Sequence, residues 1–119
     1  KLGAKSVLAI DNNDWAIENA RENFKLNSIN SGIELKLCGV EDMSLPNVNG
    51  IMANLYTHLL LLNLEKFYSS LKKRKGILLA SGVLSFDEEL IIKKASEVGF
   101  IHIKTIYEEE WCAFHFSVK

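Results

Sequence analysis

Short apolar runs recur along the chain at residues 6–10, 50–54 and 76–81. Their apolar residues follow one another directly instead of alternating with polar ones. This pattern is typical of parallel strands that are buried on both faces. The runs therefore predict the inner strands of a largely parallel sheet.

Helical periodicity fills the intervals between these runs. Residues 14–27 place apolar side chains at helical spacing behind Asn13, which we predict to be the N-cap. Residues 57–73 predict a second, longer helix whose apolar stripe consists of Leu60, Leu64, Phe67 and Leu71. Ser85 and Glu88 have the spacing of a capping box, which predicts the start of a third helix.

Two other segments show strand patterns of a different kind. Residues 33–38 alternate between apolar and polar side chains, as expected for a strand near a sheet edge with one face in water. Residues 100–107 and 111–118 are β-rich and are joined by a short run of glutamates, which predicts a hairpin rather than a helical crossover. Together the segments predict an α/β fold whose sheet ends in an antiparallel hairpin.

Polar side chains close two of the predicted inner strands. Asp11 ends the first apolar run, and Asn54 ends the second. Ligands of open α/β sheets bind at the carboxyl ends of the strands, and an acidic residue there can hold ribose hydroxyls. Asp11 and Asn54 are therefore candidate binding residues, and the alternative is that each one only caps a strand or a turn.

The composition is that of one globular domain. The chain has 119 residues, of which 48% are hydrophobic and 24% are charged, so residues 1–119 are expected to form a single domain. A net charge of -1 gives no reason to expect direct binding to nucleic acid. No apolar run approaches the roughly 18 residues of a membrane span, so no membrane is expected. Cys38 and Cys112 lie at no metal-binding spacing, which predicts reduced thiols in a cytoplasmic protein without a metal site.

Several motifs resemble those of S-adenosylmethionine-dependent methyltransferases. Residues 9–27, Ala-Ile-Asp-Asn-Asn-Asp-Trp-Ala-Ile-Glu-Asn-Ala-Arg-Glu-Asn-Phe-Lys-Leu-Asn, resemble the second strand and following helix of that fold. Residues 53–56, Ala-Asn-Leu-Tyr, resemble its fourth-strand motif, and residues 109–112, Glu-Glu-Trp-Cys, resemble one particular family. That family methylates large-ribosomal-subunit protein eleven on lysine side chains and on the N-terminal amine. The resemblance implies a Rossmann-like class I methyltransferase fold with a C-terminal antiparallel hairpin.

The family's first strand, glycine-rich loop and first helix are missing from this sequence, as is its N-terminal substrate-recruiting domain. The resemblance therefore implies a truncated fold, in which residues 1–119 are a partial catalytic domain and a fragment of a longer enzyme. The strand order of the resembled fold, 3-2-1-4-5-7-6, would put the missing strand between those that end at Asp11 and Asn54. Because unpaired strand edges are costly, we expect these strands to pair with each other, with a strand-completing partner or in a dimer. Without the missing parts, we expect no measurable cofactor binding by this chain alone at submillimolar concentration.

The cofactor implied by the resemblance is S-adenosylmethionine. The residues implied in binding it are Asp11, Asn12, Glu41, Asp42, Asn54 and Leu55. Asp11 would accept hydrogen bonds from both ribose hydroxyls, since an ionised carboxylate is a pure acceptor. Glu41 and Asp42 lie where the fold usually contacts the adenine amine, although each could equally be a solvated loop acid. Leu55 would pack near the cofactor.

The catalytic residues implied are Asn54 and Tyr56. Asn54 would accept a hydrogen bond from the acceptor amine and aim the nitrogen lone pair at the methyl carbon. Tyr56 would line the amine channel, and its alternative role is packing at a helix start. No histidine or carboxylate is placed as an evident general base, so we expect the amine to lose its proton to water.

The implied function is methyl transfer from S-adenosylmethionine to amines of a ribosomal protein, which would be the partner of the enzyme. Two alternatives stay open. One is a methyltransferase for another nitrogen, such as a glutamine amide or adenine, although residues 54–57 lack both prolines of the Asn-Pro-Pro-Tyr motif of those enzymes. The other is a catalytically silent α/β fragment that acts only with a partner.

Overall fold

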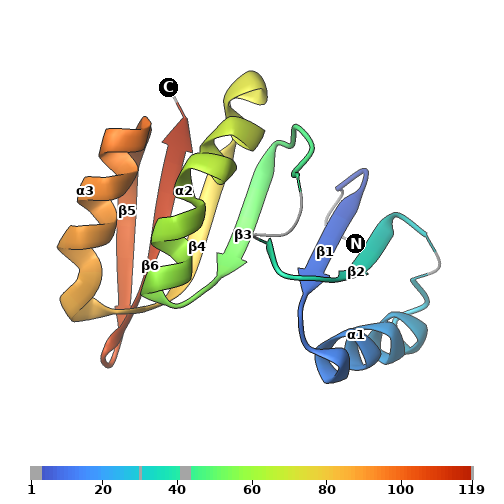
Figure 1. The fold of residues 1–119 in the computed structure, drawn as a ribbon. Coiled ribbons are helices and arrows are strands. Elements are labelled where there is room, and N and C mark those ends of the chain that lie inside the picture. The colour runs from blue at the N-terminus through green and yellow to red at the C-terminus, as the bar shows by residue number, and fades with distance from the viewer. Residues whose placement is uncertain (1–3, 30, 41–43, 119) are drawn as a thin grey trace. The chain divides into compact units, whose positions relative to one another are not determined.

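The computed structural model describes residues 4–29, 31–40 and 44–118 (Figure 1). The chain divides into two compact units, Lys1–Met43 and Ser44–Lys119. Glu41 and Asp42, two of the expected cofactor-binding residues, lie outside the described residues.

The first unit contains β1 (Val7–Asp11), α1 (Asp14–Leu26) and β2 (Ile33–Leu37). β1 and β2 pair in parallel, and Asp11 lies opposite Leu37. The predicted N-cap is confirmed, because the side-chain oxygen of Asn13 accepts a hydrogen bond from the backbone N–H of Trp15 at 2.9 Å. The prediction that β1 is buried on both faces was wrong, because Val7 is exposed and the rest of the apolar run is only half-buried.

In its described residues, 44–118, the second unit contains four strands and two α-helices. In chain order its elements are β3 (Gly50–Asn54), α2 (Thr57–Leu71), the 3-10 turn η2 (Lys72–Arg74), β4 (Ile77–Leu84), the 3-10 turn η3 (Ser85–Asp87), α3 (Glu88–Val98), β5 (Phe100–Glu108) and β6 (Trp111–Val118). The strand order is β3-β4-β6-β5; β3 and β4 are parallel, and the other neighbours are antiparallel. This order and the closing hairpin confirm the fold expected from the resemblance. β1 and β3 belong to separate sheets, and the expected pairing of their edges stays a prediction.

The core of the second unit lies between its sheet and its helices. α2 and α3 pack against each other and lie on the same face of the sheet (Figure 1). The predicted stripe of α2 is confirmed, since its members are at most 2% exposed: Leu60, Leu64, Phe67 and Leu71. On the sheet side, the rings of Phe114 and Phe116 stack with their centroids 5.4 Å apart. These contacts fix the positions of the strand ends that carry the candidate site.

The other face of this sheet carries exposed apolar side chains. Met52 lies opposite Leu79 in the β3–β4 pair, and the two are 85% and 38% exposed. The expectation that β3 and β4 are buried on both faces was therefore wrong. Within the described part of this unit, helices cover only one face of the sheet. The apolar residues of β3 and β4 point alternately to both faces, so those on the uncovered face are exposed.

Ser85 does not form the predicted capping box. α3 begins at Glu88 after the 3-10 turn, and the residue at its N-cap position, Asp87, makes no side-chain capping bond. Ser85 instead donates two hydrogen bonds to the carbonyl oxygen of Glu110, from its backbone N–H and its hydroxyl, both at 2.7 Å. These bonds attach the turn before α3 to the tip of the β5–β6 hairpin.

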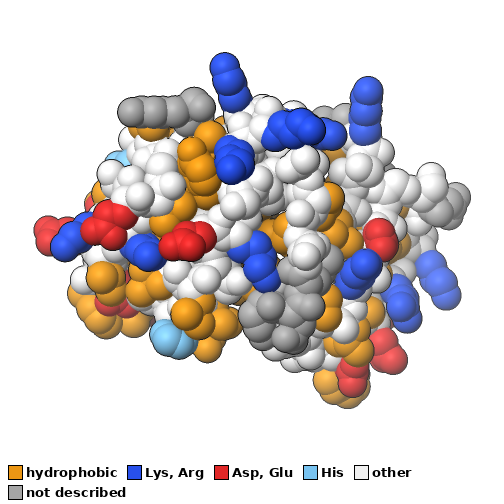
Figure 2. Space-filling model, turned by 45° about the horizontal axis from the view of Figure 1, so that its top comes forward, with side chains coloured by type: hydrophobic (Ala, Val, Ile, Leu, Met, Phe, Trp, Pro, Cys, Tyr) orange, Lys and Arg blue, Asp and Glu red, His pale blue; other side chains and the backbone are white. Residues whose placement is uncertain are grey.

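The basic run Lys72–Lys75 follows α2 directly, and all four of its residues are exposed. Figure 2 shows lysine and arginine side chains projecting into solvent on the face it displays. Cations at this position complement the negative end of the helix dipole.

Cys38 and Cys112 are both thiols; Cys38 is half-buried and Cys112 is buried. No helix in the described parts of the chain is long and apolar enough to cross a membrane.

Candidate active site at the carboxyl end of the sheet

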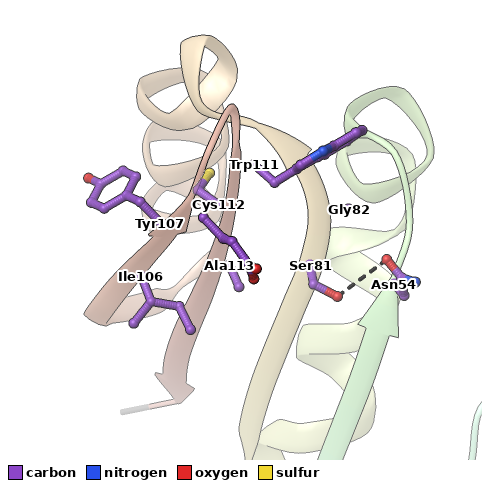
Figure 3. Close-up of a pocket in the computed structure, with 9 residues that line it drawn as sticks. Asn54, Ser81, Gly82, Ile106, Tyr107, Trp111, Cys112 and Ala113 are labelled. Carbon is purple, nitrogen blue, oxygen red and sulfur yellow. Dashed lines mark hydrogen bonds between the residues drawn. The ribbon is translucent and has the colours of Figure 1, made fainter.

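A pocket of about 430 Å³ opens in the second unit where β3 and the parallel part of β4 end (Figure 3). Its wall is contributed by all four strands. The lining residues are Asn54, Ser81, Gly82, Ile106, Tyr107, Glu108, Trp111, Cys112 and Ala113. The hairpin brings the end of β5 and the start of β6 to the same edge of the sheet, because these strands are antiparallel.

Asn54 is the predicted catalytic residue that this pocket contains. It is the last residue of β3 and lies opposite Ser81 of β4. Its side-chain oxygen accepts a hydrogen bond from the Ser81 hydroxyl at 3.3 Å, shown in Figure 3. The next backbone N–H, of Leu55, donates to the Ser81 carbonyl at 3.0 Å. The end of β3 is thus held to β4 through both backbone and side chain, which orients the amide.

Gly82 makes room for two oxygens at this edge. A Cβ atom at Gly82 would lie 2.6 Å from Oδ1 of Asn54 and 3.1 Å from the carbonyl oxygen of Leu55. The residue has a φ of 87°, and the pairing of β4 with β6 is irregular between Ala80 and Val83. Bulges of this kind are common beside active sites, and a positive φ favours glycine. The missing Cβ at this bulge therefore lets the Asn54 side chain and the Leu55 carbonyl pack closely against the backbone of β4.

Tyr107 and Cys112 supply no reactive group to the pocket. The Tyr107 hydroxyl donates to both carboxylate oxygens of Glu88 at 2.7 Å, and this hydrogen bond is the main cause of the raised pKa of Tyr107. Its ring points away from Asn54 in Figure 3. Burial raises the pKa of the Cys112 thiol, which keeps it protonated and a poor nucleophile. The pocket can therefore bind and orient a ligand, but it holds no activated nucleophile.

The other predicted residues of this strand end lie close to the pocket in sequence but do not line it. Leu55 is half-buried, and its backbone carbonyl group approaches Gly82. Tyr56 is 59% exposed and precedes α2, where its carbonyl accepts the first helical hydrogen bond, from Leu60. The channel role of Tyr56 stays a prediction.

Asp11 and Asn12 belong to the first unit. Asp11 is exposed at the carboxyl end of β1, and its Oδ1 accepts a hydrogen bond from the backbone N–H of Asn13 at 2.9 Å. An ionised carboxylate can accept more hydrogen bonds than this one. Asp11 therefore stabilises the turn before α1. Its remaining acceptor capacity also suits the hydroxyls of a ribose at the end of a parallel strand.

Sequence reasoning missed Ser81, Gly82 and Trp111 as parts of the site. A glycine inside a strand pattern often marks a bulge or a close approach, and Gly82 could have been found by that signal. Trp111 was noted only as part of a family motif. Its place in the same pocket as Asn54 depends on strand order, which is a long-range property.

Comparisons with known proteins agree with this fold. A ribosomal protein L11 methyltransferase of Chlorobaculum parvum is 33% identical over 118 residues, which cover 93% of this chain and 39% of that protein. The crystal structure of the ribosomal protein L11 methylase of Lactobacillus delbrueckii subsp. bulgaricus matches with a TM-score of 0.87 at 29% identity, over 99% of this chain and 60% of that one. TYW2 of M. jannaschii, solved in complex with AdoMet, matches with a TM-score of 0.66 at 22% identity, over 95% of this chain and 57% of that one, and shows the fold alone.

The strand order, the polar strand ends and these matches define a Rossmann-like, class I methyltransferase domain. The family model described as "Ribosomal protein L11 methyltransferase (PrmA)" matches residues 1–119. The chain belongs to this family. It spans 39% of the length of the Chlorobaculum parvum relative.

Proposed function

We propose that this chain is part of an enzyme that transfers methyl groups from S-adenosylmethionine to amines of ribosomal protein L11, at lysine side chains and the N-terminal amine. The observation that carries this proposal is the position of the Asn54 amide oxygen, a hydrogen-bond acceptor that lines the pocket where β3 ends. An amine needs such an acceptor for an N–H group while its lone pair points elsewhere. Membership of the L11 methyltransferase family supports the same substrate.

Asn54 would act by orienting a neutral amine. A free lysine has a pKa of about 10.4, so deprotonation at pH 7 costs roughly 4 to 5 kcal/mol, and the proton is lost to water. The Asn54 oxygen then accepts one N–H of the neutral amine and fixes the direction of its lone pair. The hydrogen bond from Ser81 and the packing beside Gly82 keep the amide from rotating out of that position.

The cofactor supplies a methyl group on a positively charged sulfur. Asp11 accepts hydrogen bonds from its ribose hydroxyls, and Asn12 follows at the same strand end. Asn54 and Leu55 lie at the end of β3, where Leu55 contributes an apolar contact to the cofactor. Glu41 and Asp42, which lie outside the described residues, would contact its adenine amine, and Tyr56 would line the channel through which the amine enters. A ribosomal substrate implies that the protein acts in the cytoplasm.

Methyl transfer to purified L11 tests the proposal. The protein that contains this chain is incubated with isotope-labelled S-adenosylmethionine and L11, and the modified residues are identified by mass spectrometry. We expect label on lysine and N-terminal amines, and none on L11 whose amines have been acetylated beforehand. Label on glutamine amides, on adenine in a nucleic acid control, or on no acceptor at all would contradict the proposal.

A further inference from the structure

Trp111 is a large side chain at the pocket that has no part in the orientation of the amine by Asn54. It is the first residue of β6, lines the same pocket as Asn54 and is 46% exposed. In Figure 3 its indole extends from β6 across β4, toward the end of β3 that carries Asn54. An aromatic ring that borders a pocket and is half exposed is available to a ligand.

Hydrogen bonds and strand pairing hold the backbone at Trp111 and at the residue before it. Glu110, which precedes Trp111, accepts two hydrogen bonds from Ser85. Trp111 itself lies opposite Leu84 of β4 and Glu108 of β5. The indole is therefore carried by a paired strand and not by a free loop, so the sheet sets where the backbone of Trp111 lies relative to Asn54.

The pocket also favours positive charge. Glu108 is exposed, lines the pocket and is the cross-strand neighbour of Trp111. Among the described residues that line the pocket, none is lysine or arginine. An indole face, a carboxylate and uncharged oxygens together suit an organic cation better than a neutral or anionic ligand.

We propose that Trp111 and Glu108 form an alkylammonium-binding site that holds the acceptor and its methylated products beside Asn54. This inference rests on the proposed function, because the acceptor amine arrives as a cation and becomes one again. As the nitrogen lone pair bonds to the methyl carbon, the carbon–sulfur bond breaks, its electron pair stays on sulfur, and the positive charge moves to nitrogen. A singly or doubly methylated product must lose a proton to water again before the next transfer, whereas the fully methylated ammonium has no proton to lose.

Asn54 and Trp111 would bind different features of the amine: Asn54 accepts its N–H groups, and Trp111 attracts its positive charge. Each added methyl group removes an N–H that Asn54 could bind, while the cationic form keeps its attraction to the indole face. Trp111 should therefore matter more for the methylated intermediates than for the first acceptor. It is the residue that determines whether a methylated amine is retained for another transfer.

Nuclear magnetic resonance can test the binding without any cofactor. The chain has two tryptophans, so Trp15, which is 75% exposed on α1 of the first unit, provides an internal control. Choline is titrated against the indole N–H resonances, and 3,3-dimethyl-1-butanol serves as its uncharged isostere. We expect the Trp111 resonance to shift saturably with choline and about 2- to 30-fold more weakly with the isostere, the range of a cation–π contribution. A shift of Trp111 that equals that of Trp15, or equal binding of both probes, would refute the site.

Two further probes distinguish a lysine side chain from an N-terminal amine as the bound ammonium group. Variants then test whether the group binds at Trp111. Butylammonium represents a lysine side chain, and alaninamide represents an N-terminal amine. Trp111→Leu should remove the shifts of the Asn54 side-chain amide that butylammonium causes, whereas Trp111→Phe should retain part of them. Phe86→Leu is the matched control, since Phe86 is an 82% exposed aromatic that does not line the pocket. Circular dichroism confirms that each variant is folded; unchanged amide shifts in folded Trp111→Leu would overturn the proposal.

Methylation kinetics distinguish failure of this site from failure of the proposed function. In the protein that contains this chain, Trp111→Leu should raise the KM for a lysine peptide more than it lowers kcat, and should enrich singly methylated product. If methyl transfer proceeds but Trp111→Leu changes neither KM nor the product distribution, the proposed function stands and this inference is wrong.

Discussion

Replacing Gly82 with alanine should damage the end of β3 while leaving the rest of the sheet in place. The φ of 87° costs an alanine about 1 to 2 kcal/mol, partly offset by the lower entropy of the unfolded chain. The new Cβ would lie 2.6 Å from Oδ1 of Asn54, so the amide must rotate and lose its hydrogen bond to Ser81, at about 1 kcal/mol. The Leu55 carbonyl, at 3.1 Å, must also move. The free energy of unfolding should fall by about 2 to 3 kcal/mol in total.

Gly50→Ala provides the matched control. Gly50 begins β3, the strand that ends at Asn54, has no positive φ, and its added Cβ would meet Ile77 at an ordinary 3.8 Å. It should leave stability within about 1 kcal/mol of the parent. Urea denaturation measures both variants, and the methylation rate should fall at least about tenfold in Gly82→Ala only. If Gly82→Ala matches Gly50→Ala in both stability and rate, the close approach of Gly82 to Asn54 does not matter for the site.

Three other substitutions test separate parts of the account. Asp11→Ala should weaken S-adenosylmethionine binding by the protein that contains this chain by about 1.5 to 3 kcal/mol, measured by calorimetry, and unchanged affinity would leave Asp11 as a turn residue. Glu88→Gln should return the raised pKa of Tyr107 toward 10, seen in an absorbance titration; in the parent, the stabilisation from this bond is present below pH 10 and is lost as the pH rises through the folded-state pKa. Leu64→Ala, at a fully buried position, should cost about 2 to 5 kcal/mol of stability, whereas Leu62→Ala, at a 64% exposed position of the same helix, should cost less than about 0.5. Similar losses in both leucine variants would contradict the assignment of the buried stripe.

Features encoded by neighbouring residues were predictable from the sequence. The stripe of α2 repeats within a single helix, and the cap at Asn13 involves only the next two residues, so both could be identified without the fold. The hairpin was predictable because three glutamates cannot span a crossover. The motif around Asn54 identified the strand end and the residue that lines the pocket.

Features that depend on distant residues could not be predicted in this way. Ser85 has the spacing of a capping residue, but it binds Glu110, 25 residues away, and only the folded hairpin brings them together. The exposure of Met52 is equally non-local, because an apolar run does not reveal which face of its strand is covered. Gly82 and Trp111 join the site through the order of the strands, which local patterns leave open.

The turnover of Asn54→Ala tests the central claim most directly, since Asn54 is proposed to orient the acceptor amine. In the protein that contains this chain, kcat for L11 and the affinity for S-adenosylmethionine are measured for the parent, for Asn54→Ala and for the exposed control Leu62→Ala. We predict that Asn54→Ala lowers kcat at least about tenfold with little change in cofactor affinity, and that the control changes neither. An unchanged kcat in a folded Asn54→Ala protein would show that Asn54 does not position the amine.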